Sequence, residues 1–260
     1  MLLIPKKSNK ALMNNNAILA RTIPDIDSTL SNNSWNTIAI ALKSKIAPSS
    51  WLGQTKAIGS GEYSAYEFRL IDMQSNRYEK TNGGYTQAVF ELTLELPSNI
   101  VMNTDSTNIG GWSYSYLREE LNSTILDKLP SDLKNIISEC KVKSGAGGNS
   151  TSVLESNNKL FIPSEYEIMG VTTYSLGASE GTPQFEYYVN HNTSNDMIKK
   201  KKVEVGGTIL EVAYPYWLRS PSAPVFFVPN NLFVYMNSSG SSYAQYSNNT
   251  STSVAPIFAV

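Results

Sequence analysis

The sequence predicts an α+β fold in which helices pack against a mainly antiparallel β-sheet. Apolar residues recur three and four positions apart over residues 35–42 and again over 117–129, as is typical of amphipathic helices. Over residues 89–96 apolar and polar side chains alternate instead, which is typical of a strand with one buried face. Helices and strands are therefore both expected to contribute to one core.

Three helical segments are expected. The first lies within residues 28–47, with Asn33 or Ser34 as its cap. Its apolar stripe consists of Trp35, Ile38, Ala39 and Leu42. The second spans residues 115–129, and its stripe consists of Leu117, Leu121, Ile125 and Leu129. Pro130 ends that helix, and the third is expected over residues 131–140, where Cys140 would be a buried apolar residue at the helix end.

Strands are expected over residues 62–73 and 85–96, joined by a turn, and over the apolar segment 254–260. In the second strand the alternation predicts a polar face formed by Glu91, Thr93 and Glu95 together with Val89. Residues 159–170 should form a short strand that leads into a helical turn, because Ser164 and Glu167 have the spacing of a capping box. The segment "GAGGNSTS", residues 145–152, is expected to be the least ordered.

The composition argues against several classes of protein. A formal net charge of −1 gives no electrostatic basis for binding nucleic acid, and no apolar run is long enough to span a membrane. The basic run Lys199–Lys202 predicts a solvated strand edge or loop, with an anionic-ligand contact as the alternative. The start of the chain does not resemble a secretory signal and there is one cysteine, so we expect synthesis in a reducing cytoplasm.

Residues 1–27 contain too little apolar sequence to fold alone. They are expected to form an N-terminal arm or anchor that docks on a neighbouring subunit, with a frayed terminus as the alternative. Residues 28–260 are expected to form a single domain.

The residues do not favour an enzyme. His191 is the one histidine and lies in a polar loop, so a metal site or a pairing with Cys140 has little support. Nucleophile-elbow, phosphate-loop and dinucleotide motifs do not occur. The carboxylate pairs Glu119–Glu120 and Glu165–Glu167 show no spacing that predicts a glycosidase. We therefore expect no catalytic residue, no metal and no cofactor.

Several segments occur in order along the chain: "NIGGWSYSYLREELN", "ILDKLPSDLKNII", "KLFIPSEYEIMG", "YWLRSPS" and "VAPIFAV". Over residues 28–260 this order resembles a family of uncharacterised domains, classed only as a domain of unknown function, from bacteriophages and gut bacteria. The resemblance implies a C-type-lectin-like fold with long C-terminal loops as the binding surface. Its framework would include the core anchors Trp112 and Trp217. Arg118 and Arg219 would be partly buried donors that hold loops to the sheet, or alternatively surface ion-pair partners. The sequence motifs of calcium-dependent lectins are missing.

The segment "NNLFVYMNSSGSSYAQYSNN" follows "YWLRSPS" and is rich in Tyr, Ser, Asn and Gly. Antibody binding loops have this composition, because Tyr gives rigid contact area while Ser and Asn give adaptable hydrogen bonds. Ordinary polar loops are the alternative interpretation. The predicted ligand-binding residues are Tyr235, Asn237, Tyr243, Tyr246, Asn248 and Asn249.

With the resemblance, these observations predict a non-catalytic structural protein of a bacteriophage virion, made in the host cytoplasm. Its loops within residues 225–252 would bind a host-surface glycan or protein, as a receptor-binding or capsid-decorating subunit. Residues 1–27 would contact other virion proteins, and the protein would be oligomeric or displayed in many copies. Two alternatives are an architectural subunit that cements neighbouring capsid or tail proteins and an adhesin on a bacterial surface.

Overall fold

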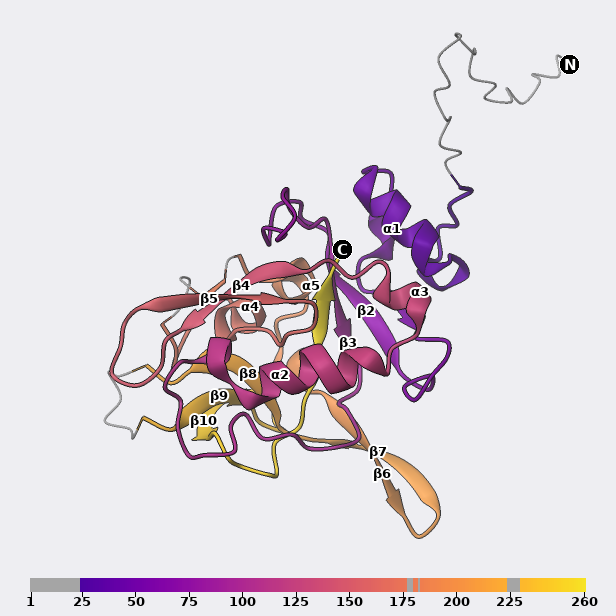
Figure 1. Ribbon diagram of the computed structural model, residues 1–260. Coiled ribbons are helices and arrows are strands. Elements are labelled where there is room, and N and C mark those ends of the chain that lie inside the picture. The colour runs from indigo at the N-terminus through magenta and orange to yellow at the C-terminus, as the bar shows by residue number, and fades with distance from the viewer. Residues whose placement is uncertain (1–23, 177–179, 182, 224–229) are drawn as a thin grey trace, which may run out of the picture.

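The computed structural model describes residues 24–176, 180–181, 183–223 and 230–260 (Figure 1). These residues form a mixed structure of helices and strands, with mostly antiparallel sheets and few helices. The predicted combination of helices with a mainly antiparallel sheet is therefore confirmed. Most of the expected N-terminal arm, residues 1–23, lies outside the described residues. Asp27 at its end is held to the body, since its carbonyl accepts hydrogen bonds from the Trp51 indole and the Asn33 amide.

The main sheet has the strand order β1-β2-β3-β11 within the described residues, and its neighbouring strands run antiparallel. Its strands are β1 Thr55–Ala57, β2 Glu67–Asp72, β3 Val89–Leu92 and β11 Ile257–Ala259. The predicted C-terminal strand is therefore confirmed, and it lies in the core, where Phe258 pairs with Phe90 across the ladder.

The remaining strands in the described part of the chain form a three-stranded sheet of order β10-β9-β8 and two hairpins, β4–β5 and β6–β7. Their bounds are β4 Cys140–Gly145, β5 Val153–Asn158, β6 Lys200–Val205, β7 Thr208–Ala213, β8 Tyr216–Pro221, β9 Leu232–Met236 and β10 Ser242–Tyr246. The β6–β7 hairpin projects away from the body of the molecule in Figure 1.

The helices are short. The α-helices are α1 Trp35–Lys43, α2 Tyr116–Glu120, α3 Ser131–Lys134, α4 Glu165–Met169, α5 Glu186–Asn190 and α6 Ser194–Met197. The 3₁₀ turns are η1 Leu30–Asn32, η2 Ser49–Trp51 and η3 Trp112–Tyr114, and a π-helical segment η4, Leu121–Ile125, continues α2.

Two predicted helix caps are confirmed. The Ser34 hydroxyl accepts the Thr37 N–H at 3.0 Å at the start of α1. At α4 the Ser164 hydroxyl and the Glu167 carboxylate each accept the other's backbone N–H, as a capping box requires. The expected stripe from Leu117 to Leu129 is buried as well.

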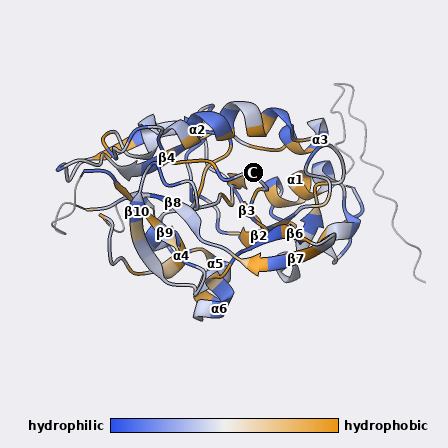
Figure 2. Cartoon of the chain, turned by 90° about the horizontal axis from the view of Figure 1, so that it is seen from below, coloured by the Kyte–Doolittle hydropathy of each residue, from blue (hydrophilic) through white to orange (hydrophobic). Residues whose placement is uncertain are grey.

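An aromatic cluster joins α1 to the main sheet. The Trp35 ring meets Phe90 edge-on at 5.7 Å, and Phe90 stacks on Phe258 at 5.0 Å. The apolar residues of β2 and β7 stand out in Figure 2, but only those of β2 belong to this core. On β7, Ile209 is 68% exposed.

The prediction that residues 131–140 are helical is wrong beyond Lys134. Cys140 begins β4, pairs with Asn158 and is buried there. From this residue onward, buried Cys140, Val142 and Ser144 alternate with more exposed lysines, so a period of two replaces the helical period. The glycine-rich segment that follows, expected to be the least ordered, is packed against the body of the protein. Gly147 and Gly148 are buried, and the Asn108 side chain accepts the Gly148 N–H at 2.8 Å.

The predicted polar face of residues 89–96 is also wrong, because Glu91 and Glu95 are completely buried. Glu91 accepts hydrogen bonds from Lys199 Nζ at 2.8 Å, the Tyr188 hydroxyl at 2.7 Å and Arg69 Nη1 at 3.2 Å. Lys199 is only 5% exposed, so the basic run does not begin as a solvated edge. A buried carboxylate is tolerated here because charged and neutral donors surround it.

Glu95 lacks such partners. Neither of its oxygens has a hydrogen bond within the described residues, and the nearby Ser253 hydroxyl donates to the Leu96 carbonyl instead. Burial raises the pKa of Glu95 from an ordinary 4.5 to about 8, although Ser253, Lys199 and Lys201 act in the opposite direction. The folded protein therefore holds this carboxyl protonated at neutral pH.

This raised pKa predicts a pH-dependent stability. Between pH 4.5 and about 8 the unfolded chain has released the Glu95 proton while the folded chain retains it, so the free energy of unfolding falls as pH rises. We expect Glu95→Gln to flatten this slope and to be more stable than the parent at pH 8, by roughly 3 kcal/mol, with little difference at pH 5. Urea denaturation at several pH values between 5 and 8 measures the free energy of unfolding of both proteins. The control is Glu204→Gln at an exposed position, and equal slopes in parent and Glu95→Gln would contradict the assignment.

Candidate functional site

A fully buried arginine organises the region that carries the predicted binding residues. Arg219 lies in β8 and is 0% exposed, more deeply buried than the expected partial burial. Its Nη atoms donate to both oxygens of Glu167, at 2.5 and 2.8 Å. Nε donates to the Lys143 carbonyl, Nη1 to the Ile162 carbonyl and Nη2 to the Glu180 carbonyl, at 2.7–2.9 Å. All five N–H donors of the guanidinium are therefore used.

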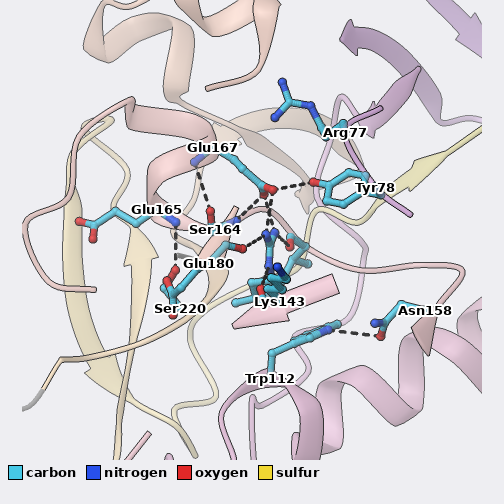
Figure 3. A network of polar contacts seen from close by, with 12 residues as sticks. Arg77, Tyr78, Trp112, Lys143, Asn158, Ser164, Glu165, Glu167, Glu180 and Ser220 are labelled. Carbon is cyan, nitrogen blue, oxygen red and sulfur yellow. Dashed lines mark hydrogen bonds and ion pairs between the residues drawn. The ribbon is translucent and has the colours of Figure 1, made fainter. Parts of the chain in front are cut away.

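Glu167 is the other half of this network (Figure 3). Besides Arg219 it accepts the Tyr78 hydroxyl at 2.6 Å and the Ser164 N–H at 2.9 Å. Burial alone would raise the pKa of Glu167, but the Arg219 guanidinium outweighs it and the pKa lies below its usual value. The pair therefore remains ionised, and it ties β8 to α4 and to the turn that precedes β3.

The network continues to the surface through Glu165. The Glu165 N–H donates to the Ser220 hydroxyl in β8 at 3.1 Å. The buried Glu165 carboxylate accepts backbone N–H groups from Thr173, Tyr174 and Ser175, at 3.0–3.4 Å. The loop after α4, and Tyr174 with it, is thus attached to the core.

The other framework residues are anchored at two places. The Trp112 indole and Arg118 Nε both donate to the Asn158 side-chain oxygen, at 3.3 and 2.9 Å, and Arg118 also donates to the Asn157 carbonyl. Trp217 is fully buried and its indole donates to the Ile100 carbonyl at 3.1 Å. Trp112 is fully buried too, whereas Arg118 is partly exposed.

Much of the expected C-terminal loop region is in fact a β-hairpin. β9 and β10 pair over their full length and are joined by a turn at residues 237–241, while residues 224–229 lie outside the described residues. β9 is apolar and almost wholly buried, whereas β10 is partly exposed, so the hairpin has one strand in the core and one near the surface. The predicted binding residues therefore lie on a hairpin of the β8–β10 sheet or close to its ends.

Two of the predicted tyrosines form a cluster with a third. Tyr235 and Tyr243 are directly opposite each other, with ring centroids 6.3 Å apart. Tyr174 lies 5.5 Å from Tyr243, and Tyr243 itself is 54% exposed. Tyr174 was not predicted, since the sequence around it reads as an ordinary Thr-, Tyr- and Ser-containing loop. We call Tyr174, Tyr235 and Tyr243 the tyrosine cluster.

The other predicted site residues do not join this cluster. Tyr246 is three residues beyond Tyr243 in the same strand, so its half-exposed ring lies on the opposite face. The Asn237 side-chain oxygen accepts the Ser239 and Ser241 N–H groups, which shapes the hairpin turn. Asn249 has the same role toward Ser251, and Asn248 is exposed beside it.

The cysteine and the histidine that the sequence analysis weighed, Cys140 and His191, lie in different settings. Burial raises the pKa of Cys140 to about 12, so its thiol stays protonated. His191 is exposed at the end of α5 and stacks on Tyr187 at 4.2 Å.

The described residues contain no group of three or more His, Cys, Asp or Glu side chains placed to hold a metal ion. Across the same residues, no helix combines the length and apolar character needed to cross a bilayer.

A polar groove of about 500 Å³ lies between the main sheet and the β6–β7 hairpin. Arg69, Lys200 and Lys202 contribute its positive charges. Each already has a partner: Arg69 pairs with Glu91, Lys200 lies 4.0 Å from Glu211, and Lys202 donates to the Ala65 carbonyl. Each of these three cations is therefore already engaged, and Glu67 and Glu211 add negative charge to the lining, so the groove does not favour an anion.

The buried network predicts a large loss of stability when its geometry is disturbed. Arg219→Lys keeps the charge but cannot replace five directed hydrogen bonds, so we expect it to lower the free energy of unfolding by about 3 kcal/mol. The matched control is Arg118→Lys, in a partly exposed arginine, with an expected loss of about 1 kcal/mol. Chemical denaturation compares them, and equal losses would contradict the framework role of Arg219.

Comparison with known proteins assigns most of this region to one family. The model of a domain of unknown function, DUF6273, matches residues 86–260, more than half of the chain. No curated protein and no solved structure matches. The match includes β3, Arg219 with its direct acceptors and the tyrosine cluster. It leaves out Tyr78, α1, β1 and β2, although β2 pairs with β3. The predicted membership of a family of unknown function is confirmed over these residues: the chain belongs to the DUF6273 family.

Proposed function

We propose that this protein is a non-catalytic binding module whose tyrosine cluster contacts a glycan or protein on a host cell surface. The observation that carries the proposal is the placement of Tyr243. Its ring is half exposed, yet Tyr174 and Tyr235 support it from two segments that the core holds in place. Rigid aromatic contact area loses little conformational entropy on binding, so it contributes more to affinity than a mobile side chain does.

The attachment of the cluster to the core supports this role. The backbone of Tyr174 is held by a hydrogen bond to the buried Glu165 carboxylate. Tyr235 lies in β9, which pairs with β8, the strand that contains Arg219. Binding residues that are held by buried neighbours keep their geometry when the ligand is absent. The buried Arg219–Glu167 pair is then a support for the surface, not a reactive group.

The setting that we propose is a bacteriophage virion, with a C-type-lectin-like domain displayed in many copies. This part of the proposal rests on the resemblance of the ordered sequence segments to phage and gut-bacterial domains. Trp112 and Trp217 are fully buried, which is compatible with the core-anchor role that this resemblance implies for them. Many copies would make weak single contacts effective.

An architectural role is a second candidate, and the β6–β7 hairpin favours it. One face of the hairpin carries Val203, Val205, Leu210 and Val212, while Lys200, Lys202 and Glu211 lie on the other face and line the polar groove. Val205, Leu210 and Val212 are 57%, 44% and 42% exposed. A projecting apolar face of this kind is typical of a contact between subunits.

The binding role predicts a difference between two equally exposed tyrosines. We expect Tyr243→Ala in the full-length chain to weaken binding to intact bacterial cells at least about 10-fold, because it removes the outermost ring of the cluster. Tyr246→Ala removes a ring of similar exposure from the opposite face and should bind as the parent does. Binding of fluorescently labelled protein to a panel of bacteria measures both, with circular dichroism as the test of folding.

Two outcomes would change the conclusion. Equal binding by Tyr243→Ala and the parent would remove the tyrosine cluster as the contact surface. Absence of cell binding, together with attachment of the full-length chain to virion particles that is lost on Val205→Lys, would favour the architectural role.

A further inference from the structure

We propose a second binding site in this chain: a groove beside the N-terminal end of α2 that binds one sugar unit, either neutral or amine-bearing. The groove has a volume of about 260 Å³ and is formed by residues 103–109 together with residues 114–119. It is lined by Asn103, Asp105, Ile109, Tyr114, Tyr116 and Glu119, among others. The site does not include the tyrosine cluster, so it goes beyond the proposed function.

Exposed aromatic rings form one side of the groove. Tyr114 is 77% exposed and Tyr116 37%, with Ile109 beside them at 65%. Gly110 has φ +87°, and a Cβ there would lie 2.8 Å from the Tyr114 ring, so the ring lies directly against the Gly110 backbone. This contact involves the base of the Tyr114 side chain, and most of the ring remains open to solvent. An open ring face of this kind can stack on the apolar C–H face of a sugar.

The loop that lines the groove, residues 103–109, is attached at several points. The Asn103 side chain is almost completely buried, accepts the Tyr116 N–H at 3.1 Å and donates to the Thr107 carbonyl at 2.7 Å. The Ser247 hydroxyl donates to the Asp105 carbonyl and accepts the Thr107 N–H, both at 3.0 Å. These bonds attach the loop to the chain after β10, so the groove is formed before any ligand arrives and little ordering is needed on binding.

The charges of the groove select the ligand. Asp105 and Glu119 are exposed carboxylates, and of the described residues that line the groove none is Lys or Arg. Carboxylates accept hydrogen bonds from sugar hydroxyls and attract an ammonium group, which the tyrosine faces also favour. They repel carboxylated, sulfated and phosphorylated sugars. The volume lies just below the range of sites for drug-sized ligands, which suits a single sugar ring.

The test uses three oligosaccharide probes and the full-length protein in isothermal titration calorimetry. The probes are a glucosamine oligomer, an N-acetylglucosamine oligomer and a polygalacturonate oligomer of equal length. We expect binding of the first or second probe and none of the third. Tyr114→Ala should weaken that binding at least about 10-fold, and Asp105→Asn should weaken the glucosamine oligomer more than the neutral one. Tyr85→Ala, at an exposed ring outside the groove, is the matched control.

Tyr243→Ala separates this site from the tyrosine cluster. If Tyr243→Ala abolishes cell binding while probe binding stays unchanged and depends on Tyr114, both sites exist. If the probes do not bind, if the polygalacturonate oligomer binds best, or if Tyr114→Ala binds as the parent does, the sugar groove is overturned whatever the cell-binding assay shows. Tyr114 is exposed, so its removal should leave the fold intact, and circular dichroism of each variant checks this.

Discussion

Complete burial of the Arg219 guanidinium is the constraint on which the rest of the described structure depends. A cation without water is stable only if every donor finds an acceptor and its charge is balanced. The acceptors come from Lys143, Ile162, Glu167 and Glu180, so β4, the segment before α4, α4 itself and the loop before α5 must all meet at β8. A displacement of any of these segments would leave a buried polar group without a partner. The network thereby specifies one arrangement of chain segments whose own helices and strands are short.

A second buried charge, Glu91, has a comparable role in the main sheet. Its donors Lys199, Tyr188 and Arg69 come from both ends of the α5–α6 region and from β2. Both networks hold ion pairs inside the protein, where each charge is balanced by directed hydrogen bonds. These buried charges fix the framework, and the exposed rings that we propose as contact area rest on it.

Helix caps and apolar periodicity made much of the local structure predictable. Ser34, the Ser164–Glu167 capping box and the stripe from Leu117 to Leu129 act over three or four residues, so their physics is contained in short segments of sequence. The helix expected up to Cys140 failed because the apolar spacing of Leu133, Ile136 and Ile137 does not itself show where a helix ends, and the pairing of Cys140 with Asn158 starts a strand there. The proposed binding surface was only partly predictable, since Tyr composition marks a segment but not the face on which each ring lies.

By itself the sequence determined the class of fold, the positions of the caps, the last core strand and the segments rich in aromatic and amide residues. Only the tertiary structure decided which charges are buried, because Glu91 and Lys199 are 108 residues apart and Glu167 and Arg219 are 52 apart. A strand that alternates Leu with Glu looks the same in sequence whether its carboxylates face water or buried donors. The tertiary structure also brought Tyr174 to Tyr243 and placed Tyr246 on the other face, since strand pairing and long-range packing, not composition, set which side chains meet.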